Sequence, residues 1–447
     1  MLRRLVPALI GAAAIAAALG LVACGGDDDN DTTTQIGDVQ GIDADCGSIE
    51  YHGSGTPTKL IVSDLPLKGD SAERSKQQND AIIQELARKG WQAGNKTQVA
   101  FQACDDSIAS TGEWDEDICR TNAQKYAANP DVIGVIGTYN SGCAAIMMPV
   151  LNKAPGGGVP MVSPGNTFVC LTEPSPTLCA PDEPDKYFPS GKRNYIRVVP
   201  NDAVQGAGMA SFANEQGIKK PFILIASDDP TSEGQGRTFE GAAKSLGMTI
   251  AGVEHYDAKA SSYTDLMKKA NAAGADAIFL GAILEENGAQ LIKDKVSVLG
   301  PNDGAVKLLA PDGFGQQSTI DQAGADSAGM YVSLPGKVPG SLTGAGSAFV
   351  KELKSQLGDQ PIEVFAPYAG QAAEVLLNAI RIGETRAGTI AALFKTHVTD
   401  GITGTFSIAP SGDPTPAPIS VQKAASTFEL EKTIVPQPEL ITAARGG

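Results

Sequence analysis

Phe222-Ile223-Leu224-Ile225-Ala226 is the segment that says most about the fold, because five consecutive apolar residues leave no face of a strand for solvent. Such a strand is typical of a sheet that helices cover on both sides. A helical stretch follows it near residues 233–246, and a short apolar strand followed by a helix recurs along most of the chain. This alternation predicts parallel strands joined by right-handed crossovers.

Ten strands are expected in the first three quarters of the chain, at 60–63, 98–103, 132–137, 160–162, 195–199, 222–226, 249–253, 277–280, 307–310 and 330–333. Helices are expected near 71–89, 116–128, 142–153, 203–216, 233–246, 262–273, 285–299, 343–357 and 366–382. Two later apolar segments, Gly404–Ile408 and residues 428–435, are candidates for closing strands.

Ten strands are too many for one comfortable sheet, and the pattern restarts near residue 200. We therefore expect an α/β protein with two doubly wound, parallel-sheet lobes. Residues 46–198 and about 337–400 are assigned to the N-terminal lobe. Residues 199–336 and about 401–440 are assigned to the C-terminal lobe.

Composition and charge exclude two broad classes of protein. Of the 447 residues, 42% are hydrophobic and 19% are charged, which suits a globular chain rather than a disordered one. The formal net charge is −16. Because an acidic surface repels phosphate backbones, nucleic acid is not an expected partner.

The first residues predict export. Arg3 and Arg4 precede an apolar run over residues 5–23, which is the pattern of a secretion signal. The sequence Leu21-Val22-Ala23-Cys24 resembles the lipobox of bacterial lipoproteins. That resemblance implies a signal peptide over residues 1–23, an acylated Cys24 and an anchor at the outer face of the cytoplasmic membrane. A plain signal anchor is the alternative.

Residues 24–45 are rich in Gly, Asp and Thr, and we expect a flexible tether there. The acidic run Asp27-Asp28-Asp29 is interpreted as part of this solvated spacer rather than as a metal site.

Six cysteines remain after Cys24, and an even number in an exported chain predicts three disulfides. Cys170 and Cys179 bracket a proline-rich insertion over residues 169–192, so a local bridge is expected there. The other candidate pairs are Cys119–Cys143 and Cys46–Cys104. The chain has no C-x-x-C pair, so neither zinc nor thioredoxin-like chemistry is expected. The insertion itself is either a lid or partner surface beside the cleft that we expect between the two lobes, or a decoration without function.

In open α/β sheets ligands bind beyond the carboxyl ends of the strands. The loop after the third expected strand reads Gly137-Thr138-Tyr139-Asn140-Ser141 and leads into a helix. A helix start with a hydroxyl can hold an anion such as a carboxylate. The alternative is that Ser141 only caps its helix.

Two further strand ends complete a possible ligand site. One is Pro164-Gly165-Asn166-Thr167, which offers carbonyls and a hydroxyl beside the first loop. The other is Pro311-Asp312-Gly313 in the second lobe, where Asp312 is either a ligand-facing carboxylate or an ordinary turn residue. A hydroxyl-and-amide pocket opposite one carboxylate suits the two charges of an α-amino acid.

The order of these motifs resembles the type I periplasmic binding proteins of the branched-chain amino-acid kind, which are substrate-binding proteins of ABC transporters. The resemblance covers residues 57–440, and its marks are Ser63-Asp64-Leu65-Pro66, Cys104-Asp105-Asp106, Val135-Ile136-Gly137, Met161-Val162-Ser163-Pro164 and Pro311-Asp312-Gly313. It implies two lobes joined by a three-strand hinge, closure around a ligand, and delivery to an ABC permease.

The resemblance also implies roles for individual residues. Ser141 matches the serine that binds the ligand carboxylate, Gly165 a carbonyl that accepts from the ammonium, and Thr167 a threonine that meets the head group, with Asn166 beside it. Asp312 stands where the family often has a glutamate. In the family's disulfide, Cys104 would be the first partner, but Asn140 occupies the second position and Cys143 lies three residues on.

The family's aromatic residues are missing at two expected contact positions, which are Thr231 and Ile283 here. Because aromatic walls pack against aliphatic side chains, their loss weakens the case for leucine, isoleucine or valine as the ligand. Glu285, Glu286 and Asn287 either reach such a ligand or form an ordinary solvated helix start.

Other functional classes lack support in the sequence. Its three histidines are far apart, and it has no G-x-S-x-G, H-E-x-x-H or P-loop motif, so neither an enzyme nor a cofactor is expected. The alternatives are a ligand-sensing envelope receptor with the same fold and, behind it, an envelope enzyme. No spanning helix or signalling domain is expected after the second lobe. We expect a lipid-anchored binding protein that captures an amino acid or amide.

Overall fold

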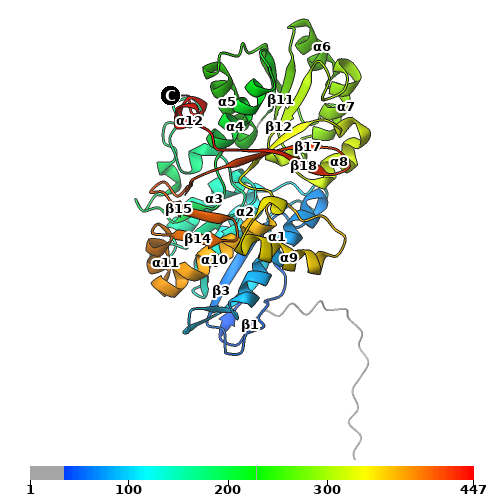
Figure 1. The fold of residues 1–447 in the computed structure, drawn as a ribbon. Coiled ribbons are helices and arrows are strands. Elements are labelled where there is room, and N and C mark those ends of the chain that lie inside the picture. Colours follow the sequence, from blue (N-terminus) through cyan, green and yellow to red (C-terminus); the bar gives the residue numbers. More distant parts are fainter. Residues whose placement is uncertain (1–34, 228, 447) are drawn as a thin grey trace, which may run out of the picture. The chain divides into compact units, whose positions relative to one another are not determined.

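The computed structural model describes residues 35–227 and 229–446. Its first lobe contains a six-stranded sheet with the order β4-β5-β3-β6-β7-β8 (Figure 1). The bounds of these strands are β3 Lys59–Leu65, β4 Gln92–Ala93, β5 Thr97–Asp105, β6 Val132–Gly137, β7 Met161–Ser163 and β8 Tyr195–Arg197. All neighbours in this sheet are parallel except the short edge strand β4.

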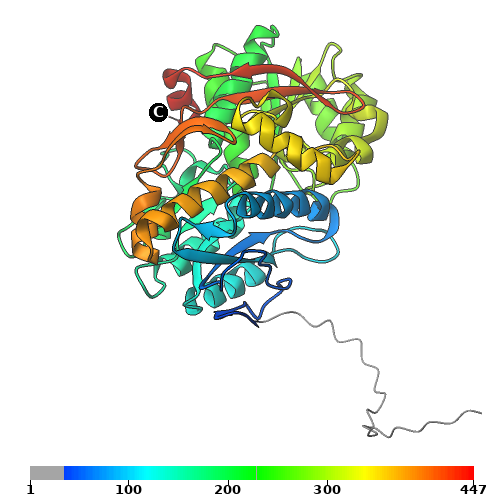
Figure 2. The ribbon, with the colours of Figure 1, turned by 60° about the horizontal axis from the view of Figure 1, so that its bottom comes forward.

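Helices cover both faces of this sheet. They are α1 Ala72–Arg88, α2 Glu116–Ala128, α3 Ser141–Asn152, α9 Ala345–Leu357, α10 Ala366–Gly383 and α11 Arg386–Leu393. The long helices α1 and α10 lie side by side although almost 300 residues separate them in the sequence (Figure 2). The late helices therefore return to the first lobe.

The second lobe contains a seven-stranded sheet with the order β10-β9-β11-β12-β13-β17-β18. Its strands are β9 Pro221–Ala226, β10 Gly252–Tyr256, β11 Ala277–Gly281, β12 Lys307–Ala310, β13 Tyr331–Pro335, β17 Ile419–Ala424 and β18 Phe428–Ile434. The first five strands are parallel, and the last two pair antiparallel at one edge (Figure 1).

The helices of the second lobe are α4 Asp202–Glu215, α5 Pro230–Ser245, α6 Thr264–Ala272, α7 Gly288–Leu299, α8 Gln317–Ala323 and α12 Pro438–Ala444. Short 3-10 turns occur in both lobes, at η1 Gly69–Ser71, η2 Val169–Leu171, η3 Asp185–Tyr187, η4 Asp312–Phe314, η5 Gly324–Ser327 and η6 Pro339–Ser341. Helices α8, α11 and α12 and strand β17 are not among the elements expected from the sequence.

Strand β9 confirms the interpretation of its apolar run. Ile223 and Ile225 pack into one hydrophobic cluster, whereas Phe222 and Leu224 pack into another on the opposite face. Strand β10 begins three residues later than expected, because its pairing with β9 starts where Gly252 lies opposite Phe222. A Cβ atom at Gly252 would lie only 2.4 Å from the Phe222 ring, so this register requires glycine.

The chain passes between the two sheets three times, after β8, after β13 and after β16 (Pro414–Thr415). Residues from all three passages, including Pro200, Gly336 and Pro416, line one small cavity of about 100 Å³. The three passages are therefore neighbours in space. That they act as a hinge stays a prediction.

The assignment of residues from 401 onward to the C-terminal lobe needs correction. Strands β14 (His397–Gly401), β15 (Gly404–Ile408) and β16 form a separate three-stranded sheet. Phe406 and Ile408 of β15 pack into a core cluster of the first lobe. Only β17 and β18 join the second sheet, because residues 416–418 carry the chain across.

The tether prediction is wrong for its last part. Residues 35–45 contain a small hairpin of β1 (Gln35–Ile36) and β2 (Val39–Gln40). Val39 is fully buried, and the Ile42 N–H donates to the Gln102 side chain at 2.7 Å. The predicted signal peptide, Cys24 and the rest of the tether lie outside the described residues. Within the described residues, no helix combines the length and apolar character that a membrane crossing requires.

Three disulfides join the six described cysteines in the expected pairs, Cys46–Cys104, Cys119–Cys143 and Cys170–Cys179. The insertion closed by the third bridge is tied to the end of the chain, since the Ser175 hydroxyl donates to the Arg445 carbonyl at 2.6 Å. It thus links the first lobe to the segment that follows α12 of the second.

Arg386 anchors the late helices to the first lobe, and we expect its loss to destabilise the fold. Its guanidinium donates to backbone carbonyls that include Val132 at 2.8 Å and Pro155 at 3.0 Å. Arg386→Met keeps the apolar stem but leaves these carbonyls without donors, so the free energy of unfolding should fall by about 3 kcal/mol. Chemical denaturation measures this loss. The exposed Arg381→Met is the matched control; an equal loss in both variants would contradict the prediction.

Candidate functional site

Ser141 joins the loops that follow β6 and β7. It is the first residue of α3, and its hydroxyl oxygen accepts hydrogen bonds from the Thr167 and Phe168 N–H groups at 3.2 Å each. The N-cap position belongs to Asn140. Ser141 therefore does not act as the cap of its own helix. Both of its acceptor positions are used, whereas its O–H is bonded to no acceptor in the described part of the chain and remains available.

The loop that carries Thr167 is held rigidly by a fully buried arginine. Arg197 donates to the carbonyls of Asn166 at 3.0 Å and Phe168 at 2.9 Å, and it pairs with Asp413 at 2.6 Å. A cation at this depth is stable only because carboxylate and carbonyl oxygens surround it. The loop is thus fixed to β8 before any ligand binds.

Asn166, one of the expected ligand contacts, has its side chain fully occupied inside the first lobe. Its amide nitrogen donates to the Thr138 and Tyr139 carbonyls at 2.9 Å each. Its side-chain oxygen accepts from the Tyr195 hydroxyl at 3.0 Å. In this structure Asn166 braces the two loops rather than offering its side chain to a ligand.

In the second lobe Asp312 follows β12 and lies in the turn η4. Its carboxylate accepts from the Gln205 amide at 2.8 Å and from the Gln235 amide at 3.2 Å. Asp312 is only 7% exposed, and this burial raises its pKa to about 6. Asp312 is therefore a buried carboxylate held by two amides and not an ordinary exposed turn residue.

Asp202 connects the two halves of the expected head-group site. This first residue of α4 is fully buried, and its backbone N–H donates to the Thr167 carbonyl at 2.7 Å. Burial, followed by the nearby Asp312 charge, raises the pKa of the Asp202 carboxyl well above its usual range. The structure thus brings Thr167 and Asp312 to the same buried region, on either side of Asp202.

This region contains more acceptors than donors. Among the described residues, the side-chain oxygens of Gln205 and Gln235 lack donors, and the Thr167 hydroxyl is the donor that faces the Asp202 carboxylate. These atoms surround the Asp312 carboxylate, which already uses both amide donors. A group with several N–H donors would satisfy them.

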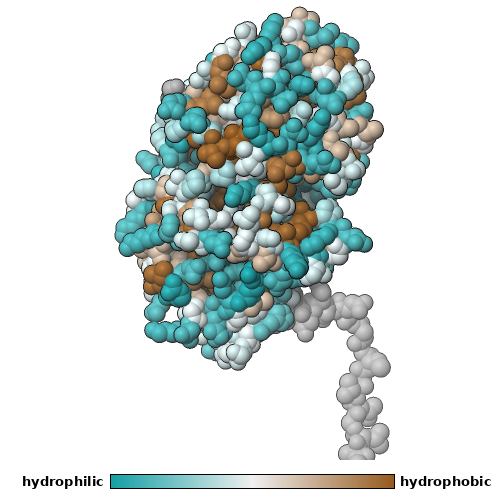
Figure 3. Space-filling view, in the orientation of Figure 1, coloured by the Kyte–Doolittle hydropathy of each residue, from teal (hydrophilic) through white to brown (hydrophobic). Residues whose placement is uncertain are grey.

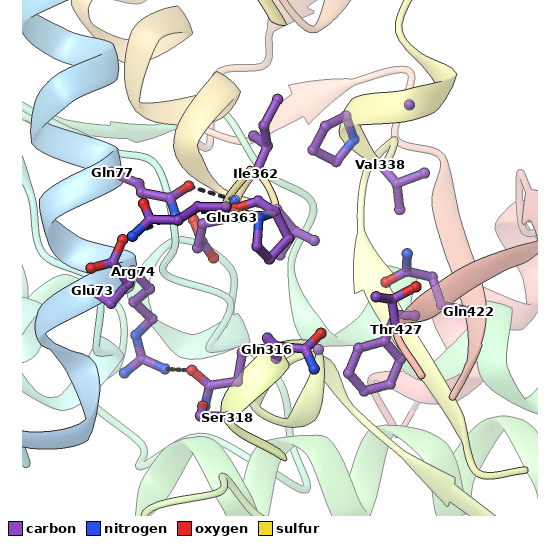
Figure 4. A pocket seen from close by; sticks show the side chains of 18 of the residues that line it. Glu73, Arg74, Gln77, Gln316, Ser318, Val338, Ile362, Glu363, Gln422 and Thr427 are labelled. Atoms are coloured by element: carbon purple, nitrogen blue, oxygen red, sulfur yellow. Dashed lines mark hydrogen bonds between the residues drawn. The ribbon is translucent and has the colours of Figure 1, made fainter. Parts of the chain in front are cut away.

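Arg74 bridges the two lobes from the first turn of α1. Its guanidinium donates to the Gln316 side chain at 2.9 Å (Figure 4) and lies 3.2 Å from the Glu285 carboxylate. It also lies 4.1 Å from the centroid of the Tyr139 ring. Burial opposes its charge most strongly, but the acidic groups around it, with Glu285 first among them, together outweigh burial and keep the pKa of Arg74 above its usual value. Arg74 and Glu285 are both almost fully buried.

The charges between the lobes converge on Tyr139. Burial is the main cause of its raised pKa, and the charges of Arg74, Asp312, Glu363 and Glu285 all act on its hydroxyl. Burial also raises the pKa of Glu363 to about 8, so this carboxyl is mostly protonated at neutral pH. We call Arg74, Tyr139, Glu285, Asp312, Gln316 and Glu363 the inter-lobe cluster.

A cavity of about 760 Å³ opens beside this cluster. Three of its lining residues also belong to the cluster: Arg74, Gln316 and Glu363. Its walls come from α1, α9 and residues 360–364 on one side, and from α8, residues 338–340, β17 and β18 on the other (Figure 4). The apolar lining includes Val338, Val350, Ile362, Val364, Phe428 and Leu430. Apolar surface is also visible around the junction of the lobes in Figure 3.

None of the ligand residues predicted from the sequence lines this cavity. Ser141, Gly165, Asn166, Thr167 and Asp312 are buried deeper. Thr231 lies in the first turn of α5 and is half-buried. Ile283 is half-buried as well and packs against Gly313, where a Cβ atom would lie 2.6 Å from its side chain.

The solvated-helix-start interpretation of residues 285–287 is wrong. The Glu285 side chain is only 4% exposed, and the Glu286 carboxylate accepts from the Ser232 hydroxyl at 2.7 Å. Burial raises the pKa of Glu286 to about 8. Asn287 uses its amide to donate to the Ala260 carbonyl at 2.8 Å. Only Glu285 of the three faces the other lobe.

Sequence reasoning missed Arg74, Gln205, Gln316 and Glu363. Arg74 had a usable signal, because it lies shortly after the carboxyl end of β3 at the start of a helix. The same strand-end rule that selected Ser141 and Asp312 would have selected it. Gln205 lies on α4, and Gln316 and Glu363 lie in irregular segments. Only long-range packing brings Gln205 to Asp312 and the other two into the inter-lobe cluster.

Comparisons with known proteins agree with this architecture. The family model described as "Periplasmic binding protein" matches residues 72–426. A leucine binding protein from Thermotoga maritima has 21% identity and a TM-score of 0.71, covering 85% of this chain and 99% of its own. A branched-chain amino acid transporter substrate binding protein from Streptococcus pneumoniae, solved with isoleucine, has 18% identity and a TM-score of 0.70, covering 85% and 100%.

A third solved structure carries a different kind of ligand. It is a solute binding protein of an ABC transporter from R. palustris in complex with 4-hydroxybenzoate, with 17% identity and a TM-score of 0.70 over 85% of this chain and 98% of its own. At these identities the likeness establishes the fold and no ligand. No curated protein sequence matches the chain.

The raised pKa of Asp312 predicts a pH-dependent stability. Its ordinary value is 3.8 and its folded value is about 6, so the fold binds a proton more tightly than the unfolded chain. The protonated Asp312 carboxyl therefore contributes to the free energy of unfolding. This contribution is complete below pH 4 and is lost as the pH rises through 6. Between pH 4 and 7 the natural chain should lose up to about 3 kcal/mol of its free energy of unfolding through this titration. We expect the Asp312→Asn variant to keep that free energy.

Denaturation of ligand-free protein at pH 4.5 and 7.5 measures the difference between Asp312→Asn and the natural chain. The other groups that face Asp312 remain in both proteins: Asp202, Arg74, Tyr139 and the amides of Gln205 and Gln235. Parallel pH profiles for the two proteins would show that Asp312 titrates normally.

Proposed function

We propose that this chain, which belongs to the periplasmic binding protein family, is the substrate-binding component of an ABC importer and captures a small solute with N–H donors between its lobes. The ligand is an amino acid or an amide. The observation that carries this proposal is the pair of donor-deficient acceptors beside Asp312, the side-chain oxygens of Gln205 and Gln235.

The proposed pose places the two ends of the ligand on opposite lobes. The ligand carboxylate accepts from the free O–H of Ser141 and from the N-terminal end of α3. The ammonium donates to Asp312 and Asp202. Such charge-assisted hydrogen bonds are each worth about 1.5–3 kcal/mol, which is enough to favour one closed arrangement of the lobes.

Capture proceeds by closure in this proposal. The lobes exchange between open and closed arrangements, and a ligand that touches both stabilises the closed one by its differential affinity. The cavity beside Arg74 gives access to the cluster, and its volume lies within the range of about 300–1,000 Å³ typical of ligand pockets. The closed form then docks on the permease.

An aromatic carboxylate is the second candidate ligand, because the R. palustris neighbour was solved with 4-hydroxybenzoate. Such a ligand has a carboxylate but no amine. It would accept the Ser141 hydrogen bond, yet it would leave the side-chain oxygens of Gln205 and Gln235 without donors from the described residues. The described geometry therefore favours an amine-bearing ligand.

The cellular setting follows from the sequence rather than from the described residues. Acylation of Cys24 would hold the binding lobes at the outer face of the cytoplasmic membrane, close to the permease. A sensory receptor or an envelope enzyme with this fold would require a signalling partner or turnover of the ligand. Mass spectrometry of the protein with any identified ligand tests for turnover.

We expect Ser141→Ala to weaken binding of the solute without unfolding the protein. A thermal-shift screen against amino acids, amides, urea and small carboxylates first identifies a ligand. Loss of the Ser141 O–H should then reduce its affinity roughly 10- to 100-fold by calorimetry. Ser347→Ala, an exposed serine on α9, is the control. Unchanged affinity in Ser141→Ala would remove the carboxylate assignment.

The amine assignment has its own test. We expect an α-amino acid to bind at least tenfold more tightly than its des-amino analogue or than benzoate, since only the amine reaches Asp312 and Asp202. Asp312→Asn should reduce the affinity for the α-amino acid more than it reduces the affinity for a neutral amide. Benzoate binding more tightly than every amino acid would instead support the aromatic-acid alternative.

A further inference from the structure

The cavity of about 760 Å³ between the lobes is not explained by the head-group site. None of the residues that we assign to the carboxylate or the amine of the solute lines it. Ligand pockets typically measure about 300–1,000 Å³, so this cavity is large enough for a ligand of its own. Its walls come from both lobes, so an occupant would touch both (Figure 4).

Apolar side chains from both lobes line this cavity. Val350 and Ile362 belong to the first lobe, whereas Phe428 and Leu430 belong to β18 of the second. Leu430 is 43% exposed, and it is one of four large apolar side chains that the described residues leave exposed. Because burying apolar surface is favourable, this lining suits a ligand with an apolar body better than a small polar solute.

One buried amide points into the cavity without a hydrogen-bond partner. Gln422 of β17 is only 5% exposed, and its side chain faces the cavity (Figure 4). Within the described residues its Oε1 atom has no donor and is shielded from solvent, whereas its Nε2 atom is not shielded. A ligand can therefore reach the Nε2 N–H. That group requires an acceptor oxygen.

Gln77, the other buried glutamine of the wall, shows that this lack of partners is particular to Gln422. The Gln77 amide donates to the Pro361 carbonyl at 3.1 Å, and its side-chain oxygen accepts from the Glu363 N–H at 2.8 Å. Both ends of Gln77 are thus used inside the protein. Only Gln422 of the two offers a group to a ligand.

Three exposed carboxylates also line the cavity, and we call Asp70, Glu73 and Asp321 the rim carboxylates. Asp70 and Glu73 belong to the first lobe and Asp321 to the second. Each accepts from one neutral side-chain amide, and none forms an ion pair within the described residues; the donors are Gln322 to Asp70, Gln77 to Glu73 and Gln317 to Asp321. The rim carboxylates therefore keep their negative charge.

The cations of the cavity wall do not offset the rim carboxylates. Arg74 is paired with Glu285 at 3.2 Å, so only Lys354 remains as a free positive charge against three negative ones. Glu363 adds little, because its raised pKa of about 8 keeps it mostly protonated at neutral pH. The resulting field attracts a cation and repels an organic acid.

We propose that this cavity is a second binding site, which takes an amphipathic organic cation: an apolar body that carries one acceptor oxygen and an ammonium group. The apolar body packs on Ile362, Phe428 and Leu430. The acceptor oxygen accepts from Gln422 Nε2, and the ammonium lies beside the rim carboxylates. Because the occupant touches both lobes, it stabilises their closed arrangement. The inference goes beyond the proposed function and uses none of its head-group residues.

The first experiment compares two probes that share an aromatic ring and an ester but have opposite charges. Benzoylcholine carries a quaternary ammonium, and monobenzyl succinate carries a carboxylate. Calorimetry on the full-length chain should show benzoylcholine binding about tenfold more tightly or better. Equal affinities, tighter binding of monobenzyl succinate, or no binding of benzoylcholine would overturn the proposal.

The second experiment removes charge from the rim. Asp70→Asn combined with Asp321→Asn should weaken benzoylcholine binding by about threefold or more at low salt, with a smaller loss at high salt. The control is Asp182→Asn combined with Asp185→Asn, which neutralises two exposed aspartates that do not line the cavity. An equal loss in both double variants would show that only the net charge of the protein matters, and would overturn the rim assignment.

The third experiment tests Gln422. On the natural chain, benzoylcholine should bind about threefold more tightly than (4-phenylbutyl)trimethylammonium, which has the ring and the charge but no acceptor oxygen. Gln422→Leu should abolish this difference while both cations still bind. A thermal melt confirms that the variant folds. Persistence of the difference in Gln422→Leu would contradict the proposed contact.

A competition measurement separates this site from the head-group site. A quaternary ammonium has no N–H to donate to Asp312, and Asp312 does not line the cavity. The amino acid or amide that the thermal-shift screen identifies should therefore not displace benzoylcholine, and displacement would overturn the second site. If the screen finds no such solute, the proposed function fails, yet the three experiments with benzoylcholine still decide the second site.

Discussion

The structure depends on one electrostatic constraint: charges buried where the two lobes meet must be neutralised across the gap, because water does not reach them. Arg74 is the clearest case, since its partners Glu285 and Gln316 both come from the other lobe. A buried cation is stable only with such partners. The same constraint makes the region responsive to a ligand, because any solute that completes the unpaired atoms also changes how strongly the lobes hold together.

The scaffold prepares this region in two different ways. In the first lobe Arg197 and Asn166 fix the loops after β6 and β7, so that Ser141 keeps a free O–H at the start of α3. In the second lobe Gln205 and Gln235 hold Asp312 but leave their own oxygens unpaired. One lobe therefore offers donors and the other offers acceptors. This asymmetry matches a solute with a carboxylate at one end and an amine at the other.

Local patterns in the sequence predicted most strands and helices, and the misses have physical causes. Strand β10 shifted because Gly252 must lie opposite the Phe222 ring. Residues 35–45 look like a spacer, yet Val39 finds a place in the core that only the folded lobe creates. Strand β15 was assigned to the second lobe although its apolar side chains Phe406 and Ile408 pack on the first. In each case a partner distant in the sequence decided the outcome.

The sequence by itself determined the alternating α/β architecture, the division near residue 200, and the strand ends that carry Ser141, Thr167 and Asp312. These features follow from apolar periodicity and from turn residues, which act over a few neighbouring positions. Only the tertiary structure showed that Arg74 meets Glu285, that Asn166 is a brace, and that Asp202 lies between Thr167 and Asp312. Those facts depend on the relative placement of elements 27 or more residues apart in the sequence. Burial and hydrogen bonding at such contacts leave no local pattern to read.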